Sequence, residues 1–275
     1  MNNIGADSKW IFISGAAGDL GKAFALECAR RGWNLFLTDL SEPALMRIAA
    51  GLHHGYGVRV VYRAADLTDP RSRSEMLRSV QESGTRFNGL INVAGMDVEG
   101  RFAEQRVEQI ETIVRLNVEA TLAVTHAVLP LREATQPFHI INVVSMAAFY
   151  PMPIKATYAA SKRFLLDFSL ALDEELRSEN VHVTALCPAG MPTRQECVDA
   201  IAAQGLVGQL TTLDVGRVAY QTIEGALKGR RVVIPGVLNR LMMQAGGLIP
   251  RQVLARLIYQ RWGKVRQQRR LAGTL

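Results

Sequence analysis

The fold that we predict rests on residues 10–21, Trp10-Ile11-Phe12-Ile13-Ser14-Gly15-Ala16-Ala17-Gly18-Asp19-Leu20-Gly21. The first five residues read as a short buried strand, and the segment 20–31 carries apolar residues at helical spacing. Glycines let a backbone approach a pyrophosphate, and a helix N-terminus offers free N–H groups and positive potential. Glycine turns also serve plain packing, but a strand before and a helix after favour a dinucleotide site.

The same alternation of strands and helices continues along the chain. Strands are predicted at 33–39, 58–63, 89–94, 138–145 and 181–187, and helices at 43–50, from Pro70, twice within 104–132, and at 157–177. Residues 51–55, Gly-Leu-His-His-Gly, read as a turn. Near-continuous apolar strands separated by helices imply a parallel sheet covered on both faces. We therefore predict an α/β fold with a doubly wound sheet of about seven strands, the Rossmann type, and a C-terminal helical extension.

We expect a single domain over residues 1–275. The segment at about 190–213 has little pattern and follows a strand end, where ligands bind in such sheets, so we interpret it as a flap over a pocket. The apolar content of 48% excludes a disordered chain, and no apolar run approaches the roughly 18 residues of a membrane span. The first residues lack the apolar core of a secretion signal, so we expect a cytoplasmic protein.

Cysteines and histidines give no sign of a disulfide framework or a metal centre. The three cysteines are scattered, and the histidines do not pair with acids at metal-ligand spacing. We therefore predict no metal site.

The net charge of +7 is unevenly distributed. Glu224 is the last acidic residue, and 11 Lys or Arg follow it. The first 224 residues hold 21 basic and 25 acidic side chains, a net of −4. The excess positive charge belongs to the tail, and the body lacks a basic stripe with interleaved aromatics, so no nucleic-acid partner is expected.

Asp39 stands at the end of the second predicted strand, 21 residues past Gly18, and Leu40 rather than a base follows it. An acid at this place binds the adenosine ribose hydroxyls and repels a 2′-phosphate. The position favours NAD over NADP, although Asp39 could instead cap the helix that begins near Ser41.

Tyr158 and Lys162 lie at i and i+4, on one face of the long predicted helix. An ammonium about 4 Å from a phenol, at an effective dielectric near 20, contributes about 4 kcal/mol, or roughly three pKa units. Such a shift would bring a phenol into the range for general acid–base catalysis. A surface Tyr and Lys one turn apart are also common, so the pair alone does not decide the function.

The order of motifs along the chain resembles the short-chain dehydrogenase/reductase superfamily over residues 10 to about 235. The motifs are the glycine loop, Asp39, Asp66-Leu67, Asn92-Val93-Ala94-Gly95, Asn117, Ser145, Tyr158 and Lys162. The resemblance implies that Tyr158 exchanges a proton with the substrate oxygen and that Ser145 hydrogen-bonds this oxygen. It also implies that Lys162 lowers the tyrosine pKa and holds the nicotinamide ribose, and that Asn117 anchors a water that relays protons.

The resemblance further implies a set of cofactor contacts. These are Gly15, Gly18, Asp19, Leu20, Gly21, Asp39, Leu40, Asp66, Leu67, Asn92, Ala94, Gly95, Tyr158, Lys162, Pro188 and Thr193. Asp66 could instead cap a helix, and residues 92–95 could form a tight turn. Asp19 replaces a glycine that the family's single-domain members usually carry, and we expect it to point outward. The glycine spacing is that of the larger, extended branch, but 275 residues are too few for that branch's substrate domain.

Beside Ser145 and Tyr158, the candidate substrate contacts are Met96, Met146 and Tyr150, which follow strand ends. They could line an apolar pocket or pack in the core. The basic tail resembles a subgroup in which Arg-Val-Val-Ile-Pro-Gly, here 231–236, precedes two basic helices, here within about 237–270. It could pack across a subunit interface, lie peripherally on an anionic membrane surface, or cover the body.

The leading hypothesis is a NAD-dependent alcohol dehydrogenase or carbonyl reductase that acts on an apolar small-molecule alcohol or ketone as a homodimer or homotetramer. Two alternatives remain: a binding protein regulated by NAD without turnover, and an epimerase or dehydratase that retains NAD.

Overall fold

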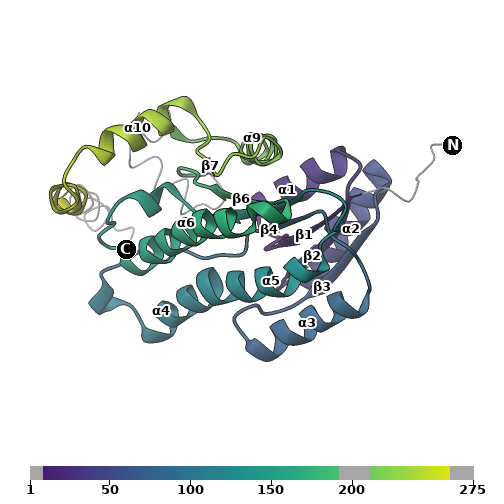
Figure 1. Cartoon of the computed structure of the whole chain (residues 1–275). Coiled ribbons are helices and arrows are strands. Elements are labelled where there is room, and N and C mark those ends of the chain that lie inside the picture. Colours follow the sequence, from purple (N-terminus) through teal and green to yellow (C-terminus); the bar gives the residue numbers. More distant parts are fainter. Residues whose placement is uncertain (1–8, 192–210, 261–275) are drawn as a thin grey trace.

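The computed structural model describes residues 9–191 and 211–260, and its centre is one parallel sheet (Figure 1). The strands are β1 (Trp10–Ser14), β2 (Asn34–Asp39), β3 (Val60–Ala64), β4 (Gly89–Asn92), β5 (Phe138–Val143), β6 (Val181–Leu186) and β7 (Val232–Val233). Their order is β3-β2-β1-β4-β5-β6-β7, and every pair is parallel. The predicted doubly wound sheet is confirmed. The chain reverses its direction of winding between β1 and β4, where ligands bind in such sheets.

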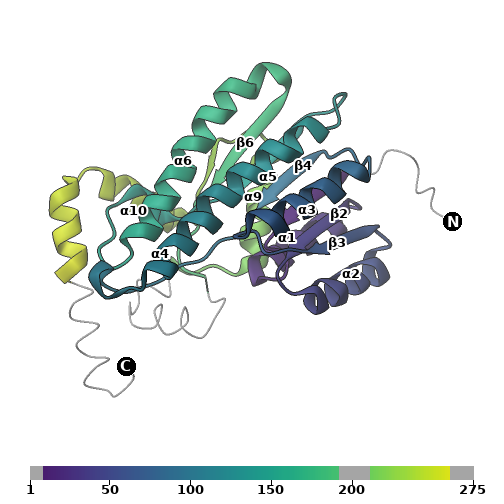
Figure 2. The same ribbon diagram turned by 90° about the horizontal axis from the view of Figure 1, so that it is seen from below.

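Helices cover both faces of the sheet (Figure 2). One face carries α1 (Asp19–Arg30), α2 (Glu42–Tyr56) and α9 (Val215–Leu227). The other carries α3 (Pro70–Glu82), α4 (Val107–Val114), α5 (Ala120–Val128) and α6 (Ala156–Leu176). Short 3-10 turns are η1 (Phe102–Glu104), η3 (Leu129–Leu131), η4 (Met146–Phe149) and η5 (Arg177–Glu179), and η2 (Arg115–Glu119) is a π-helical turn between α4 and α5.

The two cores follow from the alternation of side chains along the strands. Ile11 and Ile13 of β1 point into the cluster beneath α1, whereas Phe12 points into the opposite cluster. The Phe12 ring stacks on Phe36 at 5.0 Å between centroids and meets Phe87 edge-on at 5.9 Å. Buried apolar side chains on both faces explain why the strands read as continuous hydrophobic runs.

Helix α2 extends farther than the sequence suggested. Residues 51–55, which read as a turn, are helical, and the helix ends at Gly57 with a φ of 69°. Leu52 is buried against the core cluster of α1, and this packing outweighs the cost of about 1 kcal/mol for a glycine inside a helix. Ser41 caps the start of α2, and Asp69 caps α3, which begins at Pro70 as predicted.

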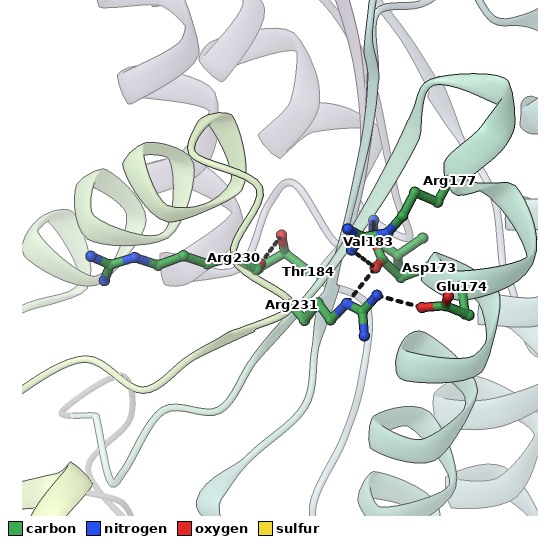
Figure 3. Close-up of polar contacts among 7 residues, drawn as sticks. All are labelled: Asp173, Glu174, Arg177, Val183, Thr184, Arg230 and Arg231. Carbon is green, nitrogen blue, oxygen red and sulfur yellow. Dashed lines mark hydrogen bonds and ion pairs between the residues drawn. The ribbon is translucent and has the colours of Figure 1, made fainter.

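A buried carboxylate fixes the C-terminal half of α6 to the sheet (Figure 3). Asp173 accepts hydrogen bonds from the backbone N–H of Val183 in β6 at 2.9 Å and from Arg177 at 2.6 Å. It also pairs with Arg231, just before β7, at 2.8 Å. Burial acts to raise the pKa of Asp173, but these hydrogen bonds and guanidinium charges outweigh it and lower the pKa. The cluster therefore joins α6, β6 and β7.

The C-terminal extension begins after β7 with α10 (Val237–Gly247), and residues 251–260 form a second helix. The predicted flap lies mostly outside the described residues, as does the end of the tail. Within the described part of the chain, none of the helices combines the length and apolarity that crossing a bilayer requires.

Candidate active site

The glycine loop forms a close-packed cradle between β1 and α1. Gly15 has a φ of 68°, and a Cβ there would lie 2.6 Å from the backbone nitrogen of Ala94. A Cβ on Gly21 would lie 2.0 Å from the carbonyl oxygen of Gly15. Both positions therefore require glycine. A Cβ on the exposed Gly18 would have only the Gly15 carbonyl as a near neighbour, at 3.5 Å.

The first turn of α1 offers backbone N–H groups at the edge of this cradle, because a helix start leaves them without intrahelical acceptors. Leu20 is buried in the first turn and holds it against the core. Asp19 is exposed, and its carboxylate lies 3.4 Å from Lys22 Nζ. A loop that brings backbone close at two glycines and opens at a third fits a bound pyrophosphate.

Asp39 ends β2 beside this loop. Its carboxylate accepts hydrogen bonds from Ala17 N at 2.9 Å and from Leu40 N at 2.7 Å, and Leu40 is exposed. Ser41 caps α2, so the alternative role of Asp39 as that cap is excluded. The carboxylate thus stands at the carboxyl edge of the sheet, next to the cradle.

Asp66 and Leu67 follow β3 at the same edge. Asp66 accepts hydrogen bonds from Thr68, at 2.6 Å from its hydroxyl and 2.8 Å from its backbone N–H. The hydroxyl bond in particular lowers the pKa of Asp66. Asp69 caps α3, so Asp66 does not have the capping role that we held as its alternative. Leu67 is buried.

The segment after β4 contributes residues to both the core and the site. The side chain of Asn92 points into the core, where its amide donates to Thr125 at 3.0 Å and Asn142 at 2.8 Å. Any contact of Asn92 with a ligand would therefore involve its backbone. Ala94 packs over Gly15, and a Cβ on Gly95 would lie 3.3 Å from Lys162 Nζ.

Asn117 lies in the π-helical turn η2, an element found often at functional sites. Its amide oxygen accepts from Met96 N at 2.9 Å, and its amide nitrogen donates to Met96 O and to Ser161, both at 3.0 Å. A Cβ on Gly95 would lie 3.1 Å from the same amide oxygen. Asn117 therefore connects the segment after β4 to α6 beside Lys162.

Lys162 is buried under the first turns of α6. Its Nζ donates to the carbonyl oxygen of Val143 at 2.8 Å and lies 5.8 Å from the centroid of the Tyr158 ring. Burial lowers the pKa of Lys162 to about 8, against the opposing effect of the Asp97 charge. The ammonium is thus fixed between the end of β5 and the tyrosine ring.

Ser145 follows β5 and begins the turn η4, where its hydroxyl accepts from Ala147 N at 3.1 Å. The next residue, Met146, donates its backbone N–H to the carbonyl of Pro188 at 2.9 Å. This bond joins the segments that follow β5 and β6. Cys187 is buried, which raises its pKa to about 12, so its thiol stays protonated near neutral pH. Thr193 lies outside the described residues.

A second cation, not predicted from the sequence, lies beside the tyrosine. Lys155 Nζ lies 6.0 Å from the centroid of the Tyr158 ring and pairs with Asp97 at 2.5 Å and Glu99 at 3.7 Å. The preceding residue, Ile154, has a φ of 64°, a strained conformation for a β-branched side chain. Lys155 is the N-cap of α6 and precedes the predicted helix 157–177, so helical spacing could not have revealed it.

The three candidate substrate contacts differ in their surroundings. Met96 is held by Asn117 through its backbone, and Met146 packs against the cluster around Leu165. The hydroxyl of Tyr150 donates to the carbonyl oxygens of Met242 and Met243 in α10, at 3.1 and 2.8 Å. Tyr150 therefore fastens α10 to the body.

Within residues 9–191 and 211–260, no group of three or more His, Cys, Asp or Glu is arranged to hold a metal ion.

The chain also matches a model of a known protein family. The family model for short chain dehydrogenases matches residues 9–198. The chain belongs to the short-chain dehydrogenase family. Members of this family are NAD(P)-dependent oxidoreductases. The family match confirms the resemblance predicted from the sequence, and the observed sheet confirms the predicted fold.

Two relatives illustrate the range of the family. A very-long-chain 3-oxoacyl-CoA reductase from Laccaria bicolor is 33% identical over 64% of this chain and 53% of its own length. The chain thus spans about half the length of the fungal reductases that it matches. Sulfoacetaldehyde reductase 2 from Chromohalobacter salexigens is 31% identical over 76% of this chain and 84% of its own.

Solved structures show the same fold. A short-chain dehydrogenase from Sphingobium yanoikuyae in complex with NADPH is 30% identical, covers 90% of this chain and 94% of its own, and superposes with a TM-score of 0.74.

Proposed function

We propose that this protein is a NAD-dependent dehydrogenase or reductase of an alcohol or carbonyl compound, with Tyr158 as the general acid and base. The observation that carries the proposal is the buried Lys162 ammonium, held by Val143 O and 5.8 Å from the Tyr158 ring centroid. A fixed positive charge beside a phenol favours its ionised form, which is what proton exchange near neutral pH requires.

The cofactor-binding surface is the carboxyl edge of the sheet. The cradle of Gly15, Gly18 and Gly21 suits a pyrophosphate, and Asp39 stands where it would bind the adenosine ribose hydroxyls. Asp66 and Leu67 follow the next strand, on the adenine side of this surface. When bound here, the cofactor would supply a hydride from its nicotinamide ring as NADH, or accept one as NAD⁺. The Sphingobium relative was solved in complex with NADPH and does not support a preference for NAD. The proposed preference for NAD therefore rests on Asp39 alone.

The side chains around Tyr158 have distinct tasks in this proposal. In the reducing direction, the carbonyl carbon gains a hydride and the carbonyl oxygen takes the phenolic proton of Tyr158, which gives an alcohol and a phenolate. Ser145 orients the reacting oxygen through its hydroxyl. Lys162 stabilises the phenolate. Asn117, which bonds to Ser161 next to Lys162, would anchor a water that relays a solvent proton back towards Tyr158.

The substrate class is a carbonyl compound or its alcohol. The relatives above are named as reductases of an oxoacyl-CoA and an aldehyde, and this supports a carbonyl substrate. Met96 and Met146, which are partly buried near the site, favour an apolar group next to the reacting carbon. The family resemblance also favours a homodimer or homotetramer.

Replacement of the phenol tests the proposal. Tyr158→Phe keeps the ring but removes the transferable proton, so we expect turnover of an identified ketone or alcohol to fall at least a thousandfold. NADH binding, followed by fluorescence titration, should change little. Full turnover by this variant would refute the mechanism. A wild-type protein that binds NADH but converts nothing in a broad ketone and alcohol panel would favour the regulatory alternative.

A further inference from the structure

The C-terminal extension, residues 237–260, is fastened to the body along one side only. Asn239 is buried and donates to the carbonyl oxygens of Thr211 at 3.0 Å and Pro235 at 2.8 Å. Tyr150 binds the backbone of α10 from the other end, and Met243 packs on the cluster around Leu165. These contacts fix α10 on the body near η4, the turn that begins after Ser145.

The opposite side of the extension is apolar and exposed. Val237 and Leu241 stand one helical turn apart in α10, and Val253 and Leu257 do the same in the second helix. Leu248, in the bend between the two helices, is 87% exposed, which is the highest value among the large apolar side chains of the described residues. Figure 2 shows the second helix, in yellow, at the edge of the molecule.

Among the described residues, a pocket separates the start of the second helix from the body. A cavity of about 420 Å³ lies between this helix and the start of α6, lined by Pro151, Met152, Ala160, Arg163 and Arg251. Several apolar residues of the extension face solvent, so packing on the body does not account for them.

All the charges of the extension have one sign. Arg240, Arg251 and Arg256 are its titratable side chains apart from Tyr259, and residues 261–275 add five Lys or Arg without an acid. A symmetric contact between two copies would bring this patch against itself, and like charges would then oppose each other. A bilayer of anionic phospholipids is complementary, because it accepts both the apolar side chains and the positive charges.

We propose that the extension docks this protein peripherally on an anionic phospholipid surface, with Leu248 and its apolar neighbours in the interface and the arginines at the headgroups. Since α10 is fastened beside η4, docking brings the membrane next to the proposed active site. The docking itself does not depend on the proposed enzymatic function.

Vesicle flotation with the full chain tests this proposal. We expect binding to vesicles of phosphatidylcholine with 30% phosphatidylglycerol to be at least tenfold tighter than to phosphatidylcholine alone, and to weaken in 0.5 M NaCl. Leu248→Glu and the double variant Arg251→Glu/Arg256→Glu should each reduce binding at least tenfold. Val107→Glu, at another exposed apolar position, on α4, is the control and should bind as the wild type does.

Three results would overturn the proposal. The first is equal binding of the wild type to both vesicle types, and the second is no binding to either. The third is a smaller oligomer of Leu248→Glu in light scattering without any loss of lipid binding, which would identify the patch as an interface between copies. Circular dichroism confirms that each variant is folded.

Discussion

Asp39 is the residue on which our preference for NAD depends. Its carboxylate already accepts a hydrogen bond from Ala17 N in the glycine loop, so it is fixed beside the cradle. Asp39→Asn retains an oxygen acceptor for this bond but removes the charge that opposes a 2′-phosphate. We expect the NADP affinity to rise about tenfold, which corresponds to about 1.4 kcal/mol, while the NAD affinity falls modestly.

Isothermal titration with both dinucleotides measures this change. Asp19→Asn is the matched control, because Asp19 is an exposed acid on the adjacent first turn of α1. The control should leave the ratio of the two affinities unchanged. Tighter binding of NADP than of NAD by the wild type would contradict the role of Asp39.

Burial of the charged Lys162 side chain destabilises the folded protein, and removing the ammonium should make this measurable. Burial lowers its pKa to about 8, so between pH 8 and its unfolded pKa near 10.4 the unfolded chain holds a proton that the folded chain has released. Stability contributed by this group therefore rises with pH in that window. The shift corresponds to at most about 3 kcal/mol. We expect Lys162→Met to abolish turnover without lowering the melting temperature at pH 7.

Thermal unfolding at pH 7 and at pH 9.5 checks this expectation. The wild type should gain stability relative to Lys162→Met as the pH rises. Lys155→Met is the control, because it removes a neighbouring ammonium but retains Lys162, and its stability should rise with pH as that of the wild type does. Parallel pH curves for the wild type and Lys162→Met would show that the ammonium is not destabilised by burial.

At the scale of elements, the sheet could be predicted because each strand can be recognised from its own residues. Buried strands such as 10–14 are continuous apolar runs, and the i, i+4 spacing of Tyr158 and Lys162 is a property of one helix. The end of α2 and the π-helical turn could not be predicted in this way. Leu52 packs against a distant helix, and Asn117 bonds to Met96 and Ser161, which lie 21 and 44 residues away. Lys155 gains its meaning only from Asp97 on another segment.

The Asp173 cluster tests how α6 is held. Asp173→Asn keeps the acceptor for Val183 N but removes the charge that faces Arg177 and Arg231 (Figure 3). Because both guanidinium groups are partly exposed, we expect a loss of about 2 kcal/mol and a melting temperature lower by about 5 °C. A lowered carboxyl pKa stabilises the fold above the unfolded value near 3.9 and ceases to do so as the pH falls through the folded value.

The difference in stability between the wild type and Asp173→Asn should therefore be full at pH 6 and shrink below pH 4. Urea unfolding at several pH values measures it. Glu111→Gln, which removes one partner of an exposed ion pair on α4, is the control and should cost under about 1 kcal/mol. A pH-independent difference would mean that Asp173 acts through packing and not through its charge.

At the scale of the whole molecule, an acidic body and a basic extension are joined through Tyr150. Its hydroxyl is the donor for the backbone carbonyls of Met242 and Met243, and a Cβ on Gly246 would lie 2.6 Å from the same oxygen. The Tyr150 phenol thus contributes to the close approach of α10 to η4, together with Asn239 and Met243. Tyr150→Phe removes a hydrogen bond that contributes about 1 kcal/mol, so we expect amide exchange across 237–247 to quicken about fivefold while the sheet is unaffected. Hydrogen-exchange mass spectrometry resolves the two regions. Tyr220→Phe on α9 serves as the control and should leave α10 protected, whereas unchanged exchange in Tyr150→Phe would show that Asn239 and Met243 hold the extension without the phenol.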